Sequence, residues 1–211
     1  MTLFDLTGRV AVITGTSRGI GRELALGFAA AGAIVVGCAR TAEAAEKTAA
    51  ELRALGHDTL ALGADVATPE GAAALVDAAV QRYGKLDVMV NNAGWTHRNQ
   101  PALETTEEEF DKCYAINVKS IYLSTIHATP VFRAQGGGSF INIASTAGVR
   151  PRPGLTWYNG SKGAAIVTSK SLAAELGPAF RVGPERIRQL GQAAQQPQSP
   201  EQAVLERVGN P

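Results

Sequence analysis

Cysteine is scarce in this chain, whose 211 residues include only Cys38 and Cys113. Two cysteines cannot supply the disulfide framework that holds many small secreted domains together. Both fall inside segments with apolar periodicity, where a free thiol behaves as a small hydrophobic side chain. We therefore predict two reduced thiols in the core and a cytoplasmic location.

A long hydrophobic run and an excess of charge of one sign are also lacking. No uninterrupted apolar run is long enough to span a bilayer, and residues 1–10 do not have the basic-then-apolar layout of a signal peptide. The 20 Lys and Arg residues are scattered among 19 acidic ones, and 45% of the residues are hydrophobic. Such a balance argues against disorder and against a basic surface for nucleic acid. We predict no membrane and no nucleic-acid partner.

Short apolar runs alternate along the chain with longer segments of helical periodicity. Regular alternation of this kind predicts an α/β fold, a Rossmann-type doubly wound parallel sheet in a single domain. In such a sheet, ligands bind beyond the carboxyl ends of the strands. The predicted strands are 10–14, 33–38, 59–64, 86–90 and 139–143, and the predicted helices include 41–55, one that opens at Pro69, two divided near Asn117, and 156–176.

The last part of the chain has a different composition. From Pro178 onward the apolar content falls, residues 192–200 are rich in Gln and Pro, and no strand-like run recurs. We therefore predict a catalytic domain over residues 1–179 and an atypical, loosely attached tail over 180–211. The sheet is predicted to lack its last strand or strands.

The first predicted strand leads directly into a glycine-rich turn, Thr14-Gly-Thr-Ser-Arg-Gly-Ile-Gly21. Gly15 permits a tight turn, while Gly19 and Gly21 let the backbone approach a pyrophosphate and let the helix pack closely on the sheet. The following helix, with Ile20, Leu24 and Phe28 spaced along one side, presents free N–H groups to the phosphates. The glycines could instead merely form a turn, but their position between strand and helix favours a nucleotide site.

The end of the second strand indicates which nucleotide is bound. The strand ends at Cys38-Ala-Arg40, with no Asp or Glu, and Arg18 lies in the glycine-rich turn nearby. An acidic residue at this position bonds the ribose 2′-hydroxyl, whereas Arg accommodates a 2′-phosphate. The pair therefore favours NADP(H) over NAD(H). The alternative is that both arginines are solvated surface residues.

A catalytic pattern follows the fifth strand. Ser145 comes directly after that strand, and Tyr158 and Lys162 lie four residues apart on one face of the next helix. Free tyrosine has a pKa of about 10, and a neighbouring ammonium favours the phenolate. Lowering this pKa to about 7 requires roughly 4 kcal/mol of stabilisation of the phenolate relative to the phenol, and one close cation supplies much of it. On its own, a Tyr/Lys pair at this spacing is more often a pair of surface residues without a catalytic role.

The remaining candidates give weaker signals. The three histidines, His57, His97 and His127, show no metal-ligand spacing, so we predict no metal site. Trp95 and Trp157 follow motifs on the catalytic side of the sheet and are candidates for a pocket wall. Ordinary core packing is the alternative for both tryptophans.

Together these motifs resemble the short-chain dehydrogenase/reductase family, over residues 6 to about 177. The glycine-rich turn matches the family pattern. Asp65 resembles the family residue that contacts the adenine ring, and Asn91-Asn-Ala-Gly94 matches the family signature after the fourth strand. The resemblance implies a catalytic tetrad of Asn117, Ser145, Tyr158 and Lys162. It implies that the cofactor contacts Gly15, Ser17, Arg18, Gly19, Ile20, Gly21, Arg40, Asp65, Val66, Asn92, Ala93, Gly94, Tyr158 and Lys162.

The resemblance also implies a role for each member of the tetrad. Tyr158 would exchange a proton with the substrate oxygen, and Lys162 would assist it and bond the nicotinamide ribose. Ser145 would orient the substrate carbonyl, and Asn117 would hold a helix irregularity and a water that relays protons. The implied substrates are ketones or aldehydes and alcohols, and the implied assembly is a homodimer or homotetramer.

One part of the family pattern is missing. Family members usually continue with a sixth strand that ends in an Asn-x-x-x-Pro-Gly-like turn, followed by a substrate-covering loop. Residues 180–184 are the nearest match to that strand, and no Pro-Gly turn follows them. Two hypotheses therefore stand: an NADP(H)-dependent oxidoreductase, and a truncated or diverged non-catalytic protein that binds nucleotide or a partner.

Overall fold

The computed structural model describes residues 5–177 of the chain. The predicted boundary between residues 179 and 180, the tail, and the possible sixth strand lie outside the described residues. None of the helices within residues 5–177 is long and apolar enough to cross a membrane.

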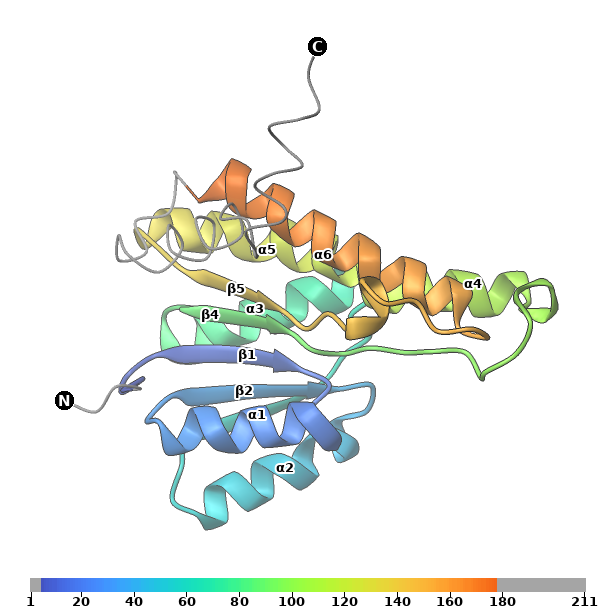
Figure 1. Cartoon of the computed structure of the whole chain (residues 1–211). Coiled ribbons are helices and arrows are strands. Elements are labelled where there is room, and N and C mark those ends of the chain that lie inside the picture. Colours follow the sequence, from blue (N-terminus) through green and yellow to red (C-terminus); the bar gives the residue numbers. More distant parts are fainter. Residues whose placement is uncertain (1–4, 178–211) are drawn as a thin grey trace, which may run out of the picture.

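The described residues form a five-stranded parallel sheet in the order β3-β2-β1-β4-β5, as the alternating pattern predicts (Figure 1). The strand order reverses beside β1, which is where ligands bind in doubly wound sheets. The strands are β1 (Val10–Thr14), β2 (Ile34–Ala39), β3 (Thr59–Gly63), β4 (Val88–Asn91) and β5 (Ser139–Asn142). The α-helices are α1 (Gly19–Ala30), α2 (Ala42–Ala54), α3 (Pro69–Tyr83), α4 (Glu107–Tyr114), α5 (Ser120–Ala134) and α6 (Thr156–Leu176).

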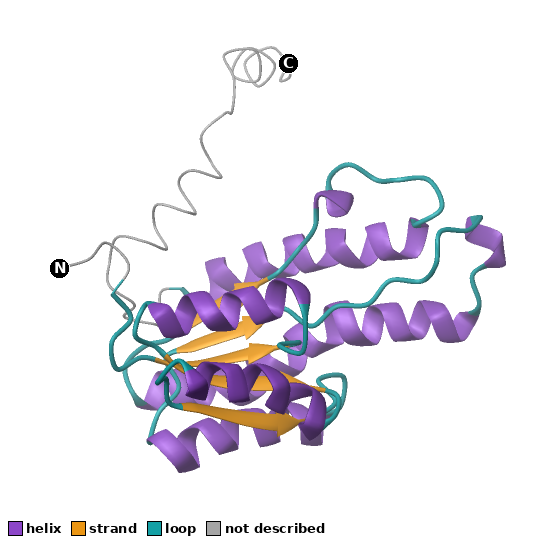
Figure 2. Cartoon of the chain, turned by 90° about the horizontal axis from the view of Figure 1, so that it is seen from below, coloured by secondary structure: helices purple, strands orange, loops and turns teal. Residues whose placement is uncertain are grey.

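Helices cover both faces of the sheet (Figure 2). The central strand β1 is buried throughout, and its successive side chains point to opposite faces. Val10 and Val12 join a core cluster with residues of α3 and α5, including Phe132. Ala11 and Ile13 join a second cluster with residues of α1 and α2. This two-sided burial explains why β1 is a continuous apolar run rather than an alternating one.

The buried face of α1 differs in part from the apolar face of Ile20, Leu24 and Phe28 that the sequence predicts. Its buried residues are Gly21, Ala25 and Ala29, while Ile20 is 64% exposed. Leu24 and Phe28 pack only partly against the core. Small side chains allow the helix to approach the sheet closely, so the apolar stripe predicted from Ile20 is displaced by one position. Ile20 instead lines a cavity at the carboxyl edge of the sheet.

The start of α1 is held close to the turn that precedes it. Gly15 has a φ of +75°, in the left-handed region that favours glycine. A Cβ on Gly21 would overlap the Gly15 carbonyl group and would lie 2.5 Å from Nδ2 of Asn92. Gly21 therefore has no room for any side chain.

We predict that Gly21→Ala lowers the free energy of unfolding by about 2 kcal/mol, because the added methyl overpacks the turn. This corresponds to a fall in Tm of roughly 4–8 °C, measured by differential scanning calorimetry. Gly27→Ala is the matched control, because it lies in the same helix with open space around its Cβ. It should leave Tm unchanged or raise it, since Ala favours helix. An equal Tm for Gly21→Ala and the native chain would contradict this packing.

Candidate active site

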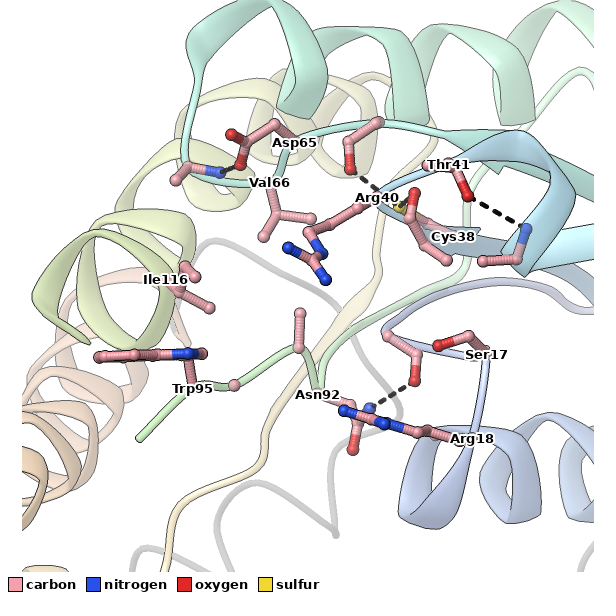
Figure 3. Close-up of a pocket in the computed structure, with 18 of the residues that line it drawn as sticks. Ser17, Arg18, Cys38, Arg40, Thr41, Asp65, Val66, Asn92, Trp95 and Ile116 are labelled. Carbon is pink, nitrogen blue, oxygen red and sulfur yellow. Dashed lines mark hydrogen bonds between the residues drawn. The ribbon is translucent and has the colours of Figure 1, made fainter. Parts of the chain in front are cut away.

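A cavity of about 1130 Å³ opens at the carboxyl edge of the sheet. It is walled by the segments that follow β1 to β4 and by the end of α4 (Figure 3). Eleven of the cofactor residues predicted from the sequence line it: Gly15, Ser17, Arg18, Ile20, Gly21, Arg40, Asp65, Val66, Asn92, Ala93 and Gly94. Gly19, Tyr158 and Lys162 are not among its lining residues.

The N-terminus of α1 faces this cavity without a competing anion. Arg18, at the N-cap position, makes no side-chain capping hydrogen bond, and the first turn of α1 contains no acidic residue. The first N–H groups of a helix have no intrahelical partner. Because they carry the positive end of the helix dipole, they are suited to bind a phosphate.

The turns after β1 and β4 are joined by a set of hydrogen bonds around Thr14. The backbone N–H groups of Asn92 and Ala93 donate to Oγ1 of Thr14, at 3.0 and 2.9 Å. The Asn92 side chain donates in return to the Thr14 carbonyl, at 2.8 Å. These bonds explain two of the sequence motifs, because the amide of Asn92 is needed to hold the glycine-rich turn against the Asn-Ala-Gly segment.

Most charged groups that line the cavity are cationic. Arg40 extends its guanidinium into the cavity from the end of β2, and Arg18 lies beside Asn92 (Figure 3). Lys47 and Lys112 also line it, against a single carboxylate, Asp65, among the described residues. A cavity with this excess of positive charge attracts phosphate groups.

Cys38 lies in the wall of the same cavity as an unpaired, buried thiol. Burial raises its pKa to about 12, and a backbone hydrogen bond with Ala64 offsets this only in part. The burial of Cys38 confirms the prediction of a core cysteine. Cys113 is likewise buried and unpaired.

The two tryptophans have different environments. Trp95 lines the cavity, and Nζ of Lys112 lies 4.8 Å from the centroid of its ring. Trp157 instead packs edge-on against Phe110, with ring centroids 5.3 Å apart, and its indole N–H donates to the Ala102 carbonyl. The pocket-wall interpretation is confirmed for Trp95, and core packing applies to Trp157.

The sequence reasoning did not identify Lys47, Lys112 or Ile116 as cavity residues. A signal was present for two of them. Lys112 and Ile116 are four residues apart in the helical segment that leads to Asn117, so they share one face. That face must turn toward the sheet edge once Asn117 is placed in the site. No comparable signal marked Lys47.

The helix between β4 and β5 is interrupted at Asn117. Residues Ala115–Lys119 form a π-helical turn, η2, which confirms the predicted division. The buried side chain of Asn117 accepts a hydrogen bond from the backbone N–H of Trp95, at 2.9 Å. Its Nδ2 donates to the Trp95 carbonyl at 2.8 Å and to Oγ of Ser161 at 2.9 Å. Asn117 thus ties the segment after β4 to α6.

Lys162 reaches the same place from α6. Its ammonium donates to the Ile143 carbonyl at 2.8 Å, and only 5% of the residue is exposed. Burial lowers the pKa of Lys162 from its ordinary value. A Cβ built on Gly94 would lie 3.6 Å from Nζ of Lys162 and 3.4 Å from Oδ1 of Asn117. Gly94, a residue of the cavity wall, therefore faces Asn117 and Lys162 across the space of about one methyl group.

Ser145 follows β5, and Tyr158 lies on α6 with Lys162. Oγ of Ser145 accepts a hydrogen bond from the Ala147 N–H at 3.1 Å, so its own proton is available to another acceptor. The short helix η3 (Thr146–Gly148) that follows Ser145 packs against α6. Tyr158 lies one turn before Lys162, partly exposed, and its hydroxyl makes no hydrogen bond with the residues that the structure describes.

The arrangement provides hydrogen-bond donors and one buried ammonium, and no cluster of metal ligands. Within residues 5–177, no three His, Cys, Asp or Glu side chains gather as a metal site would require. The free phenol of Tyr158, the hydroxyl of Ser145 and the ammonium of Lys162 are groups that can exchange a proton with an oxygen atom or donate one to it.

Comparison with known proteins agrees with this geometry. The short chain dehydrogenase family matches residues 9–183. Over 171 residues the chain is 48% identical to the 4-formylbenzenesulfonate dehydrogenase of Comamonas testosteroni, which covers 81% of this chain and 68% of that protein. Over 176 residues it is 38% identical to the 2-dehydro-3-deoxy-D-gluconate 5-dehydrogenase of Escherichia coli, covering 83% and 68%.

Among solved structures, the chain is similar to the 3-ketoacyl-(acyl-carrier-protein) reductase from Brucella melitensis complexed with NADH. The TM-score is 0.79 at 41% identity, over 83% of this chain and 73% of the other. The chain therefore belongs to the short-chain dehydrogenases, a family of oxidoreductases that act on alcohol and carbonyl groups.

Proposed function

We propose that this protein is an NADP(H)-dependent oxidoreductase that interconverts a ketone or aldehyde and an alcohol. The observation that carries the proposal is the contact at Gly94. This residue lines the phosphate-binding cavity and adjoins both Asn117 and Lys162. A dinucleotide whose phosphates lie over the turn after β1 would extend along this wall toward the catalytic residues.

In the proposed mechanism, a bound nicotinamide supplies or accepts the hydride. Ser145 donates its free hydroxyl proton to the substrate oxygen and orients it. Tyr158 exchanges a proton with that oxygen, as general acid in reduction and as general base in oxidation. The ammonium of Lys162, one helix turn away, favours the phenolate by its charge. Asn117 holds the segment after Gly94 against α6 through its amide.

Replacement of Tyr158 by Phe should reduce kcat by at least a hundredfold, because general acid–base catalysis contributes about 10²–10⁴. The measurement is steady-state oxidation of NADPH with a panel of aldehydes and ketones. Tyr83→Phe is the matched control, because the Tyr83 hydroxyl bonds Asp58 at the far end of α3. It should keep native turnover. Full turnover by Tyr158→Phe would overturn the assignment.

The choice of NADP(H) is supported by Arg18 and Arg40, which line the cavity while the end of β2 offers no carboxylate. Both arginines are exposed, so their charges are free to pair with a 2′-phosphate. Two similar structures contain the other cofactor, NAD(H): one contains NADH, and the other, a xylitol dehydrogenase, contains NAD⁺.

Arg40→Ser should raise the Kd of NADPH about tenfold or more, because a hydrogen bond between charged groups contributes roughly 1.5–3 kcal/mol. The Kd of NADH should change less than twofold. Arg53→Ser is the control, because Arg53 lies on α2 and pairs with Glu46. It should change neither constant. Isothermal titration calorimetry measures all of them, and a native chain that binds NADH tenfold more tightly than NADPH would refute the NADP(H) assignment.

A non-catalytic nucleotide-binding or interaction protein is the second candidate. It is favoured by the edge of the sheet at β5, which pairs with β4 and has no second strand partner within residues 5–177, and where Ile141 is 40% exposed. Exposed strand edges invite association with other chains. The tetrad argues for the enzyme, because a binding protein has no need of an ammonium buried beside the cavity. Binding of NADPH without its oxidation by any carbonyl compound would instead support this candidate.

We further propose that the protein is cytoplasmic, which its two buried, unpaired thiols support, and that it assembles as a homodimer or homotetramer. Tyr122 and Ile126 of α5 are 59% and 51% exposed, and Val167 of α6 is 64% exposed. Large apolar side chains in such positions are typical of an interface. Multi-angle light scattering of the purified protein should give twice or four times the chain mass, and a monomer mass would contradict the assembly.

A further inference from the structure

We infer that Ser161, a residue with no assigned role, is a positioning residue of the catalytic site. Its hydroxyl joins Asn117 to the backbone of Tyr158 and so sets the first turn of α6 relative to the π-helical turn η2. The inference rests on the proposed function, because it concerns the geometry of the proposed tetrad.

The hydroxyl of Ser161 is completely buried between two members of that tetrad. Oγ donates to the Tyr158 carbonyl at 2.8 Å. The same oxygen accepts from Nδ2 of Asn117 at 2.9 Å. Ser161 also immediately precedes Lys162, whose ammonium lies next to Gly94. One side chain therefore links the backbone of Tyr158, the amide of Asn117 and the backbone that carries Lys162.

No other group can take over this link at equal strength. The Asn117 amide has a second possible acceptor in Sγ of Cys113, at 3.4 Å. A thiol sulfur is a weak acceptor. Burial raises the pKa of Cys113, despite hydrogen bonds with Ser161 and Asn117, so the sulfur does not become a thiolate. Without the serine hydroxyl, one N–H of a buried amide would be left poorly satisfied.

Such a defect would be relieved by movement of the residues around it. η2 lies between α4 and α5, and the bond from Asn117 to Ser161 joins η2 to α6. A shift of α6 relative to η2 changes the position of the Tyr158 phenol relative to Gly94 in the cavity wall. Misplacement by about 1 Å can reduce the rate up to 10²-fold. The turn after β1 lies outside α6, so we expect most of the cofactor affinity to remain.

The same helix contains a matched serine outside the site. Oγ of Ser169 donates to the Ala165 carbonyl at 2.6 Å and accepts from Nδ2 of Asn142 at 2.8 Å. Ser169 thus bonds one backbone carbonyl of α6 and one asparagine amide, as Ser161 does. Because Asn142 belongs to β5 and not to the tetrad, Ser169→Ala removes equivalent bonds without touching the catalytic residues.

The test compares Ser161→Ala and Ser169→Ala in the full chain. We expect Ser161→Ala to lower kcat about tenfold, with the KM for NADPH within about twofold of the native value. The pH at which kcat/KM for alcohol oxidation is half-maximal should rise by roughly half a unit or more, because Lys162 assists a displaced phenol less well. Ser169→Ala should lower Tm about as much as Ser161→Ala does, and it should leave kcat and the pH profile unchanged.

A second readout needs no substrate. The near-ultraviolet absorbance of the Tyr158 phenolate is obtained as the difference between each variant and its Tyr158→Phe counterpart. Its titration midpoint should move to higher pH in Ser161→Ala and stay at the native position in Ser169→Ala. If Ser161→Ala does not fold, Ser161→Cys, which keeps nearly the same volume with a weaker acceptor, should show the same changes at smaller size.

Native kcat, pH profile and titration midpoint in folded Ser161→Ala or Ser161→Cys would overturn the inference. Equal shifts in Ser169→Ala would overturn it as well, because the effect would then be a general loosening of α6. Failure of the proposed function has a different signature, since the native chain would then bind NADPH without oxidising it, or Tyr158→Phe would keep full turnover whatever the Ser161 variants do.

Discussion

The site depends first on the hydrogen bonds between Thr14 and Asn92. These bonds fix the turn after β1 against the segment after β4, two pieces of chain that are 78 residues apart. They are short because β1 and β4 are neighbouring parallel strands, whose carboxyl ends necessarily lie at one edge of the sheet. The close approach requires Gly21, which has no space for a side chain. The glycine-rich turn and the segment that contains Gly94 therefore hold each other in place.

The side-chain amide of Asn117 makes a second set of hydrogen bonds, between the segment after β4 and α6. Asn117 holds the backbone of Trp95, just beyond Gly94, and passes the connection to Ser161 of α6. Lys162 completes it by bonding the Ile143 carbonyl at the end of β5. Asn92 thus connects the segments after β1 and β4, and Asn117 connects the segment after β4 to α6. The amide of Asn117 both accepts from and donates to the backbone of Trp95, whereas the amide of Asn92 donates to the Thr14 carbonyl.

Much of this could be predicted from the sequence. The strands, the break at Asn117 and the cavity residues after β1 and β2 follow from local patterns, because period and turn chemistry are local properties. The cavity residues after β3 and β4 are predicted from the family resemblance. Side-chain partners across the fold could not be predicted in the same way. The bond from Asn117 to Ser161 spans 44 positions, and the contribution of Lys47 to the cavity depends on how α2 packs. Ile20 shows the limit within one helix, where close packing of small residues outweighed the apolar spacing.

The central claim is that one cavity carries the cofactor from the phosphate-binding turn to the tetrad. A crystal structure of the full chain with NADP⁺ bound tests it most directly. The account predicts the diphosphate over the N-terminus of α1, the 2′-phosphate beside Arg18 and Arg40, and the nicotinamide ring facing Tyr158. A diphosphate bound away from the Gly15–Gly21 turn, or a nicotinamide ring directed away from Tyr158, would contradict it.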